Sequence, residues 1–132
     1  MSQAIHLGDL QCAIMRVLWS RGEATVAEVH AVLHADRGLA LTTIATMLSK
    51  MEKKGVVSHR TRGRRFVYRS EVAERDVHRS MVSELVDRLF AGDAGALVSH
   101  LLTERQIDPA ELARLEALVA AKERETRGRD GD

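Results

Sequence analysis

The chain has little cysteine, few aromatic residues and no long apolar run. Cys12 is the only cysteine among 132 residues, which excludes an intramolecular disulfide and suits a reducing compartment. No apolar stretch approaches the roughly 20 residues that a membrane-spanning helix needs, and there is no signal-peptide pattern. We therefore expect a cytoplasmic protein that does not insert into a membrane.

Aromatic residues make up only 3% of the chain, so stacking platforms for single-stranded nucleic acid are nearly absent. Catalytic patterns are missing as well, because no nucleophile lies at a recognisable spacing from a base and no glycine-rich loop could cradle a phosphate. His30 and His34 lie four residues apart, but two ligands without a carboxylate or cysteine partner make a weak metal site. We expect no enzyme, no cofactor and no metal centre.

The charges of the chain are unevenly distributed. Residues 1–70 carry 11 Lys and Arg against 5 Asp and Glu, and residues 71–132 carry 9 against 14, so the two parts have net charges of +6 and −5. Seven of the 11 positive residues fall between Lys50 and Arg65. Such a localised basic patch favours a polyanion as the partner of the first part.

An amphipathic helix is predicted at about residues 42–54, followed by Gly55 at a position that suits a helix end. Its apolar residues recur at helical spacing and would share one buried face: Ile44, Met47, Leu48 and Met51. The opposite face would carry Thr42, Thr43, Thr46, Lys50 and Lys53. A helix in a DNA major groove has its N-terminal residues nearest the base edges, so we assign the threonines to base or phosphate contacts and the lysines to phosphates.

A β-hairpin is predicted directly after this helix, with short strands at Val56–Val57 and Phe66–Tyr68. Its turn would present Arg62, Arg64 and Arg65, which suit a DNA backbone or a minor groove.

Two helices precede the amphipathic one. The first is predicted to begin with Asp9 as its N-cap and to end near Arg21. The second begins with a capping box formed by Thr25 and Glu28 and ends near Gly38. Three helices and a hairpin in this order are typical of a winged helix-turn-helix domain, here at residues 1–70. The fold class is therefore mainly α with a small β-hairpin.

The remaining residues are predicted to form a helical arm at 71–123 and a flexible tail at 124–132. A long helix would begin with Ser70 as its cap and reach about Phe90, a short helix would cover about residues 96–102, and the last would open with Pro109. The apolar stripes of these helices need a partner. Their residues are Val77, Met81, Leu85, Leu89, Leu101, Leu112, Leu115 and Leu118.

Two functions agree with these patterns. Taken singly, outward threonines are as often a solvated helix face, and arginines as often a soluble turn. Because all of them converge on one surface that the architecture independently predicts, we favour binding to double-stranded DNA. The alternative is a winged-helix module that meets an acidic protein and does not read a DNA sequence. Preference for one duplex over random DNA would separate the two.

Three segments resemble the BlaI/MecI penicillinase repressor family: Thr42–Leu48, Glu52–Val57 and Gly63–Tyr68. The likeness extends to Leu7–Leu10 and Val17–Trp19 and covers the chain to about residue 122. It implies a homodimeric transcriptional repressor, in which the winged domains bind a dyad operator and the helices of the arm dimerise through the apolar stripes.

Family members that control β-lactam resistance are released from DNA when a membrane-sensor protease cuts the dimerisation arm. The resemblance places the corresponding segment at residues 96–102, where the family's Asn-Phe cleavage pair is replaced by His100 and Leu101. Copper-responsive relatives carry paired cysteines near the C-terminus, whereas this chain has only Cys12, which argues against a copper signal.

Overall fold

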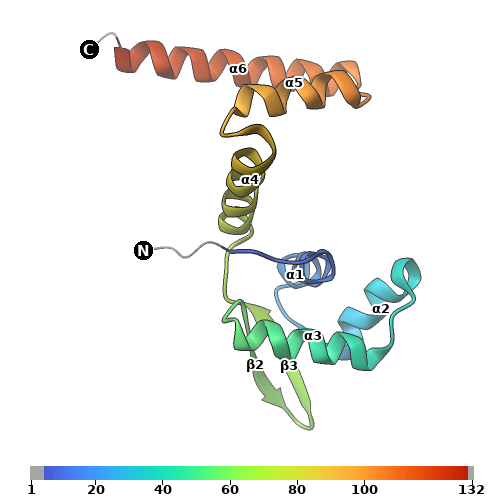
Figure 1. The fold of residues 1–132 in the computed structure, drawn as a ribbon. Helices are drawn as coiled ribbons and strands as arrows, with labels where there is room; N and C mark the ends of the chain where they lie inside the picture. Colours follow the sequence, from blue (N-terminus) through green and yellow to red (C-terminus); the bar gives the residue numbers. More distant parts are fainter. Residues whose placement is uncertain (1–4, 131–132) are drawn as a thin grey trace. The chain divides into compact units, whose positions relative to one another are not determined.

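The computed structural model describes residues 5–130, which form six helices and three strands (Figure 1). In chain order these are α1 (Asp9–Arg21), β1 (Ala24–Thr25), α2 (Val26–Arg37), α3 (Leu41–Lys53), β2 (Val57–Arg62), β3 (Arg65–Ser70), α4 (Glu74–Phe90), α5 (Ala94–Glu104) and α6 (Pro109–Asp130). They divide into two compact units, of which the first ends at Leu85 and the second begins at Val86. The fold is mainly α with a small sheet, as predicted.

The first two helices begin with different caps. Gly8 is the N-cap of α1, so the prediction of Asp9 is wrong by one residue, and the side chain of Gln11 accepts the Gly8 N–H at 3.2 Å. Helix α2 has the predicted capping box: the Glu28 N–H donates to the Thr25 hydroxyl at 3.1 Å, and the Thr25 N–H donates to the Glu28 carboxylate at 2.9 Å. Two N–H groups that the helix itself leaves unpaired are thereby satisfied.

Helix α3 has the two faces that its sequence predicts. Ile44, Leu48 and Met51 are fully buried, and Met47 packs against the same core partly buried. The helix ends at Lys53, and Gly55 then takes a φ of 84°, a conformation that favours glycine.

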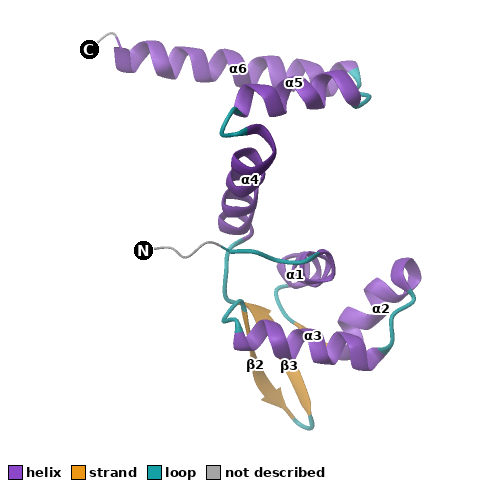
Figure 2. Cartoon of the chain, viewed as in Figure 1, coloured by secondary structure: helices purple, strands orange, loops and turns teal. Residues whose placement is uncertain are grey.

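The sheet has the order β1-β3-β2 and is antiparallel throughout. Strands β2 and β3 have six residues each, longer than predicted, and they pair from Val57↔Ser70 to Arg62↔Arg65. The turn is therefore Gly63 and Arg64 alone, with Gly63 at a φ of 65°. Strand β1 has only two residues, too few for a sequence pattern to reveal, and it adds to the other edge of β3. Figure 2 shows the hairpin running beside α3.

The core of the first unit lies among α1, α2, α3 and the sheet, and it includes a residue of α4. Its largest fully buried side chains are Ile14, Met15, Leu18, Val29, Ile44, Leu48, Met51, Val57 and Val77. Because Val77 is buried here and Met81 packs against the same core, this unit extends beyond the predicted boundary at residue 70.

The link from the sheet to α4 is held by Trp19 of α1. Its indole N–H lies 3.1 Å from the Ser70 hydroxyl and 3.0 Å from the Val72 carbonyl. Ser70 is the last residue of β3, and α4 begins only at Glu74, so the prediction that Ser70 caps this helix is wrong. The Ser70 hydroxyl instead bonds to the backbone of Val72 and to Trp19.

In the second unit, α5 and α6 begin with the side-chain caps Asp93 and Asp108. The Asp93 carboxylate accepts the Ala96 N–H at 3.0 Å, and the Asp108 carboxylate accepts the Glu111 N–H at 2.8 Å. Pro109 is the first residue of α6, as predicted. None of the described side chains from Val86 onward is buried.

The tail that we expected to be flexible from residue 124 is instead helical to Asp130; residues 131 and 132 lie outside the described residues. Ion pairs between side chains three or four residues apart support this end of α6. They are Lys122–Glu125, Arg127–Glu123 and Arg129–Glu125. Among the described residues, no helix is both long and apolar enough to cross a bilayer.

Candidate nucleic-acid interface

The outward face of α3 is fully available. Every residue that we assigned to it is exposed: Thr42, Thr43, Thr46, Lys50 and Lys53. Within residues 5–130, none of these five side chains forms a hydrogen bond or an ion pair. The hydroxyls and ammonium groups can therefore bind a ligand without first breaking an internal contact.

The three arginines of the hairpin turn are exposed in the same way. Arg62 and Arg65 face each other directly across the strands, with Arg64 in the turn between them. Like charges opposite each other in a ladder repel, and among the described residues none of the three guanidinium groups forms an ion pair within 4 Å; only Arg62 lies near enough to Glu23 for its charge to help lower the pKa of that carboxyl. An anion bound at the tip would relieve this repulsion.

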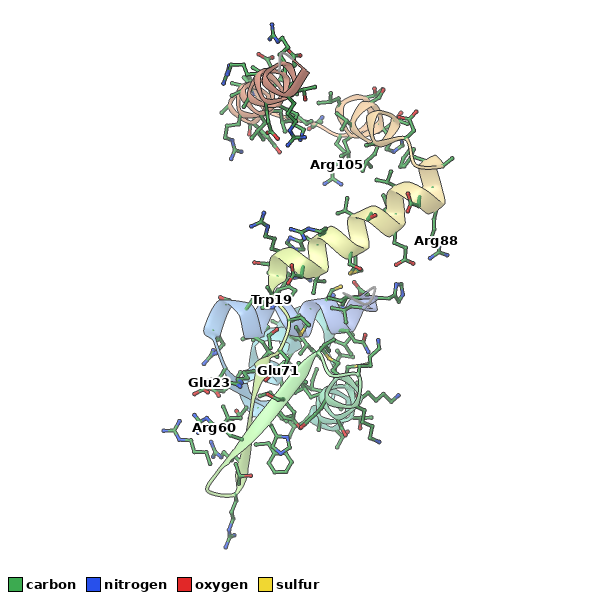
Figure 3. All side chains as sticks on the ribbon, turned by 90° about the vertical axis from the view of Figure 1, so that its left-hand side faces the viewer. Trp19, Glu23, Arg60, Glu71, Arg88 and Arg105 are labelled. Atoms are coloured by element: carbon green, nitrogen blue, oxygen red, sulfur yellow. The ribbon has the colours of Figure 1, made fainter. Side chains whose placement is uncertain are left out.

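Two other arginines of the hairpin are neutralised by carboxylates, as the labelled side chains of Figure 3 illustrate for Arg60. Arg60 donates to both carboxylate oxygens of Glu23, at 2.7 and 3.3 Å, and this hydrogen bonding lowers the pKa of Glu23. Glu71 accepts from the Ser58 hydroxyl and, at 3.2 Å, from Arg69, and both contacts lower its pKa. Uncompensated positive charge on the hairpin is thus concentrated at its tip.

Sequence reasoning missed a contact between α3 and the hairpin. The His59 Nδ1 lies 2.7 and 2.9 Å from the two carboxylate oxygens of Glu52, and the His59 ring stacks on that of Phe66 with centroids 3.9 Å apart. Behind them, Tyr68 is buried, which raises the pKa of its hydroxyl. Strand alternation could have placed His59, Phe66 and Tyr68 on one face if the turn had been known to be Gly63 and Arg64.

His30 and His34 serve the turn between α2 and α3. The His30 Nε2 lies 2.8 Å and the His34 Nδ1 3.4 Å from the carbonyl oxygen of Leu39. Within the described part of the chain, no group of three metal-ligating side chains comes together. The pair therefore has a structural task at the turn that positions α3.

The apolar residues that we assigned to dimerisation fall into two groups. Val77 and Met81 pack in the core of the first unit, and Leu115 is half-buried. The other residues of the set are exposed: Leu85, Leu89, Leu101, Leu112 and Leu118. His100 and Leu101, at the suggested cleavage position, are both exposed within helix α5.

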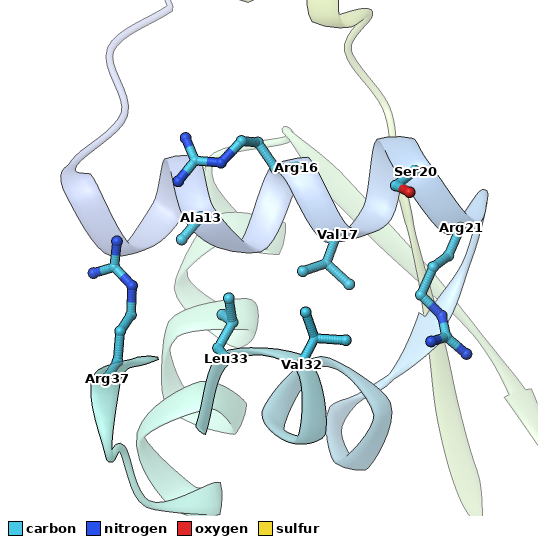
Figure 4. A pocket seen from close by; sticks show the side chains of 8 residues that line it. All are labelled: Ala13, Arg16, Val17, Ser20, Arg21, Val32, Leu33 and Arg37. Atoms are coloured by element: carbon cyan, nitrogen blue, oxygen red, sulfur yellow. The ribbon is translucent and has the colours of Figure 1, made fainter. Parts of the chain in front are cut away.

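A groove of about 710 Å³ lies between α1 and α2 (Figure 4). It has an apolar floor and arginines at its two ends, Arg37 and Arg21, which form ion pairs of 2.8 Å with Asp9 and Glu28. The hydrogen bond from Arg37 lowers the pKa of Asp9. Because α3 and the hairpin contribute no residue to this groove, it is separate from the basic surface described above.

Comparison with known proteins agrees with this geometry. The sequence profile described as "Penicillinase repressor" matches residues 7–121. The transcriptional regulator BlaI of Mycobacterium tuberculosis (strain ATCC 25618 / H37Rv) is 38% identical over 125 residues, which cover 89% of this chain and 90% of that protein. The penicillinase repressor of Bacillus licheniformis is 27% identical over 115 residues, covering 87% and 90%.

Among solved structures, the solution structure of the DNA-binding domain of the repressor BlaI is similar to this one with a TM-score of 0.51. The two are 32% identical, and the match covers 58% of this chain and 93% of that domain. The winged-helix architecture predicted for the first unit is thereby confirmed, and the relatives of the chain are transcriptional regulators.

Proposed function

We propose that this chain, which belongs to the penicillinase repressor family, is a homodimeric transcriptional repressor that binds a dyad operator in double-stranded DNA. The observation that carries the proposal is that one winged-helix unit combines a helix face of unengaged hydroxyls and ammonium groups with a hairpin tip whose arginines form no hydrogen bond or close ion pair among the described residues. Such a protein acts where the DNA is, in the cytoplasm.

In this proposal α3 lies in the major groove. Thr42, Thr43 and Thr46 are nearest the bases, because the N-terminal turns of a recognition helix reach deepest. A threonine hydroxyl can bond to a phosphate or a base, and its methyl group can contact thymine. Lys50 and Lys53 lie further along the helix, where ammonium groups meet phosphates.

The hairpin forms the second part of the interface. Arg62, Arg64 and Arg65 would bind phosphates or enter the adjacent minor groove, and the repulsion between Arg62 and Arg65 would be relieved there. The release of counterions from DNA by these groups should make affinity steeply dependent on salt.

The exposed leucines of the second unit and of the end of the first support a dimer. Leu85, Leu89, Leu101, Leu112 and Leu118 expose apolar surface that a second copy of the chain would cover. A two-fold dimer of winged domains reads two half-sites about one helical turn apart, or a multiple of it.

We further propose that cleavage of the dimerisation arm by a membrane-sensor protease ends repression, at the position of His100 and Leu101. Both residues lie in α5, so the helix must open locally before a protease can bind it in extended form. Mass spectrometry of the repressor before and after exposure of the host cells to a β-lactam tests this step. An intact chain in derepressed cells would contradict it.

The decisive test of the proposed function is fluorescence anisotropy with duplexes from upstream of the chain's own gene, measured across a salt series with random duplex as competitor. A repressor should bind one duplex tightly, depend on its dyad and survive competition. Weak binding that salt abolishes on every duplex would favour a module that binds an acidic protein.

Matched variants assign the contacts. Replacing Arg64 and Arg65 by Ala should weaken binding to all duplexes and lower the salt slope by about one unit per lost phosphate contact. Arg69→Ala is the control on the same hairpin, because Arg69 is already paired with Glu71. Thr46→Val keeps the shape of the side chain but removes the hydroxyl, so it should reduce preference for the operator more than general affinity.

A further inference from the structure

Phe66 is unusual among the aromatic residues of the chain. The chain has four aromatic residues, and Phe66 is the one that the structure exposes, at 48%, whereas Tyr68 is buried and Trp19 and Phe90 are half-buried. A single exposed apolar side chain needs no explanation by itself. What distinguishes Phe66 is how its ring is held.

The Phe66 ring is fixed to the recognition helix through one intermediate. It stacks on the His59 ring at an interplanar angle of 17°, and His59 contacts both carboxylate oxygens of Glu52 in the last turn of α3. The Tyr68 ring lies beside Phe66 in an edge-to-face arrangement, at a centroid distance of 6.4 Å. The exposed ring is therefore oriented by side chains from α3, β2 and β3.

The stacked rings of His59 and Phe66 lie on the side of the hairpin that faces α3. Strand alternation puts His59, Phe66 and Tyr68 on the hairpin face that meets α3, and Phe66 follows the turn arginines Arg64 and Arg65 directly. If α3 lies in the major groove and the hairpin tip contacts the minor groove, the strand that separates the two grooves must cross between them. The exposed ring lies between helix and tip on that face.

We propose that Phe66 packs against the deoxyribose of this intervening strand, with His59 and Glu52 as the residues that position it. The proposal rests on the DNA-binding function proposed above and adds to it an apolar contact between two electrostatic ones. Deoxyribose offers CH groups to an aromatic ring and is the same at every base pair, so the contact adds affinity and no sequence preference.

The salt dependence of binding distinguishes this contact from those of the arginines. Phe66→Ala should weaken binding by about tenfold, equally on operator and random duplex, and should leave the salt slope unchanged because no counterion is involved. Val32→Ala is the matched control, because Val32 is exposed to a similar extent, 46%, on α2. Unchanged affinity of the Phe66 variant, or a loss confined to the operator, would overturn the proposal.

A spectroscopic test uses the scarcity of phenylalanine. Full-length protein grown with 4-fluorophenylalanine carries fluorine at two positions only, Phe66 and Phe90, and Phe90→Leu assigns the two resonances. On addition of duplex, the Phe66 signal should shift and be protected from a soluble gadolinium chelate. If the labelled protein binds duplex and this signal stays accessible, the inference fails while the proposed function stands. If no duplex binds at all, the proposed function itself fails.

The positioning role of His59 is tested by comparing the losses of DNA affinity in the two single variants with the loss in the double variant. If His59 acts by positioning Phe66, His59→Ala should weaken binding about threefold, and the double variant should bind no more weakly than Phe66→Ala alone. His59→Phe, which retains a ring for stacking, should restore most of the protection of the Phe66 fluorine. Additive losses in the double variant would show that His59 contacts DNA independently and would overturn its positioning role.

Discussion

The two units of the chain differ in where their apolar side chains lie. The first unit buries a continuous set from Leu7 to Val77, including fully buried Ile14 and Leu48. From Val86 onward none of the described side chains is buried, and Leu89 and Leu118 are 71% and 66% exposed. The first unit therefore has a packed apolar core, whereas the second leaves exposed the apolar side chains that could form one.

The two units are therefore stabilised by different means. In the first, burial of apolar surface supplies most of the free energy of folding. In the second, caps such as Asp93 and Asp108 and ion pairs along α6 stabilise single helices, and such local contacts are worth only about 0.2–2 kcal/mol each. Stability of the second unit should therefore depend on association.

The largest effect is expected when the second unit is removed. A protein that ends at Leu85 should still unfold cooperatively, because its core is intact. If the proposed dimer binds a dyad operator, the affinity of this fragment for the full operator should fall by about 10²- to 10⁴-fold, because two linked domains would no longer bind together. Thermal denaturation followed by circular dichroism, together with anisotropy, measures both. An unfolded fragment, or unchanged affinity, would contradict the division of tasks.

Core truncations in the two units should differ in cost. Leu48→Ala removes a fully buried side chain of α3 and should lower the free energy of unfolding of the first unit by about 3 kcal/mol. Leu102→Ala, at a side chain 46% exposed, should cost about 1 kcal/mol or less. Urea denaturation of both variants gives the two values. Equal costs would mean that the second unit has a packed core of its own in solution.

A charge placed on an exposed apolar side chain of each unit tests which of these surfaces is used for association. If the chain forms the proposed dimer, Leu89→Asp should weaken it by about 30-fold, because association would bury an unpaired carboxylate. Val32→Asp places the same charge on an exposed apolar residue of the first unit and should leave the dimer unchanged. Analytical ultracentrifugation across a dilution series measures this, and an unaffected Leu89 variant would remove that residue from the interface.

The smallest effect is expected in the pH dependence of the melting temperature. Hydrogen bonds from Thr25, from its backbone N–H first and then its hydroxyl, lower the pKa of Glu28 from its ordinary value of 4.5. A carboxyl whose pKa is lowered by folding stabilises the folded protein fully at a pH above its unfolded-state pKa. This stabilisation is lost as the pH falls through the folded-state pKa. Glu28→Gln should therefore lose slightly less melting temperature than the parent between about pH 7 and about pH 3.5. A larger loss in the variant would contradict the sign.

Some features followed from the sequence because their causes are local. The capping box of Thr25 and Glu28 involves residues three apart, and the buried face of α3 follows from helical spacing. Gly55 and Gly63 take the positive φ values that their places after a helix and in a hairpin turn imply. Ser70 was wrongly predicted to cap α4. A serine before a helix is typical of an N-cap, but here the hydroxyl lies at the end of a strand and accepts a hydrogen bond from Trp19, which is distant in the sequence.

The amino-acid sequence was enough to predict the winged-helix order, the basic face of α3 and the arginine-rich tip, because periodicity and turn residues act over a few positions. The three-dimensional structure was needed to show that Arg62 opposes Arg65, that Val77 belongs to the first core, and that Glu52 and His59 hold the ring of Phe66. These relations depend on strand register and on packing between segments far apart in the chain, and a shift of one residue in register turns every side chain of a strand to its other face.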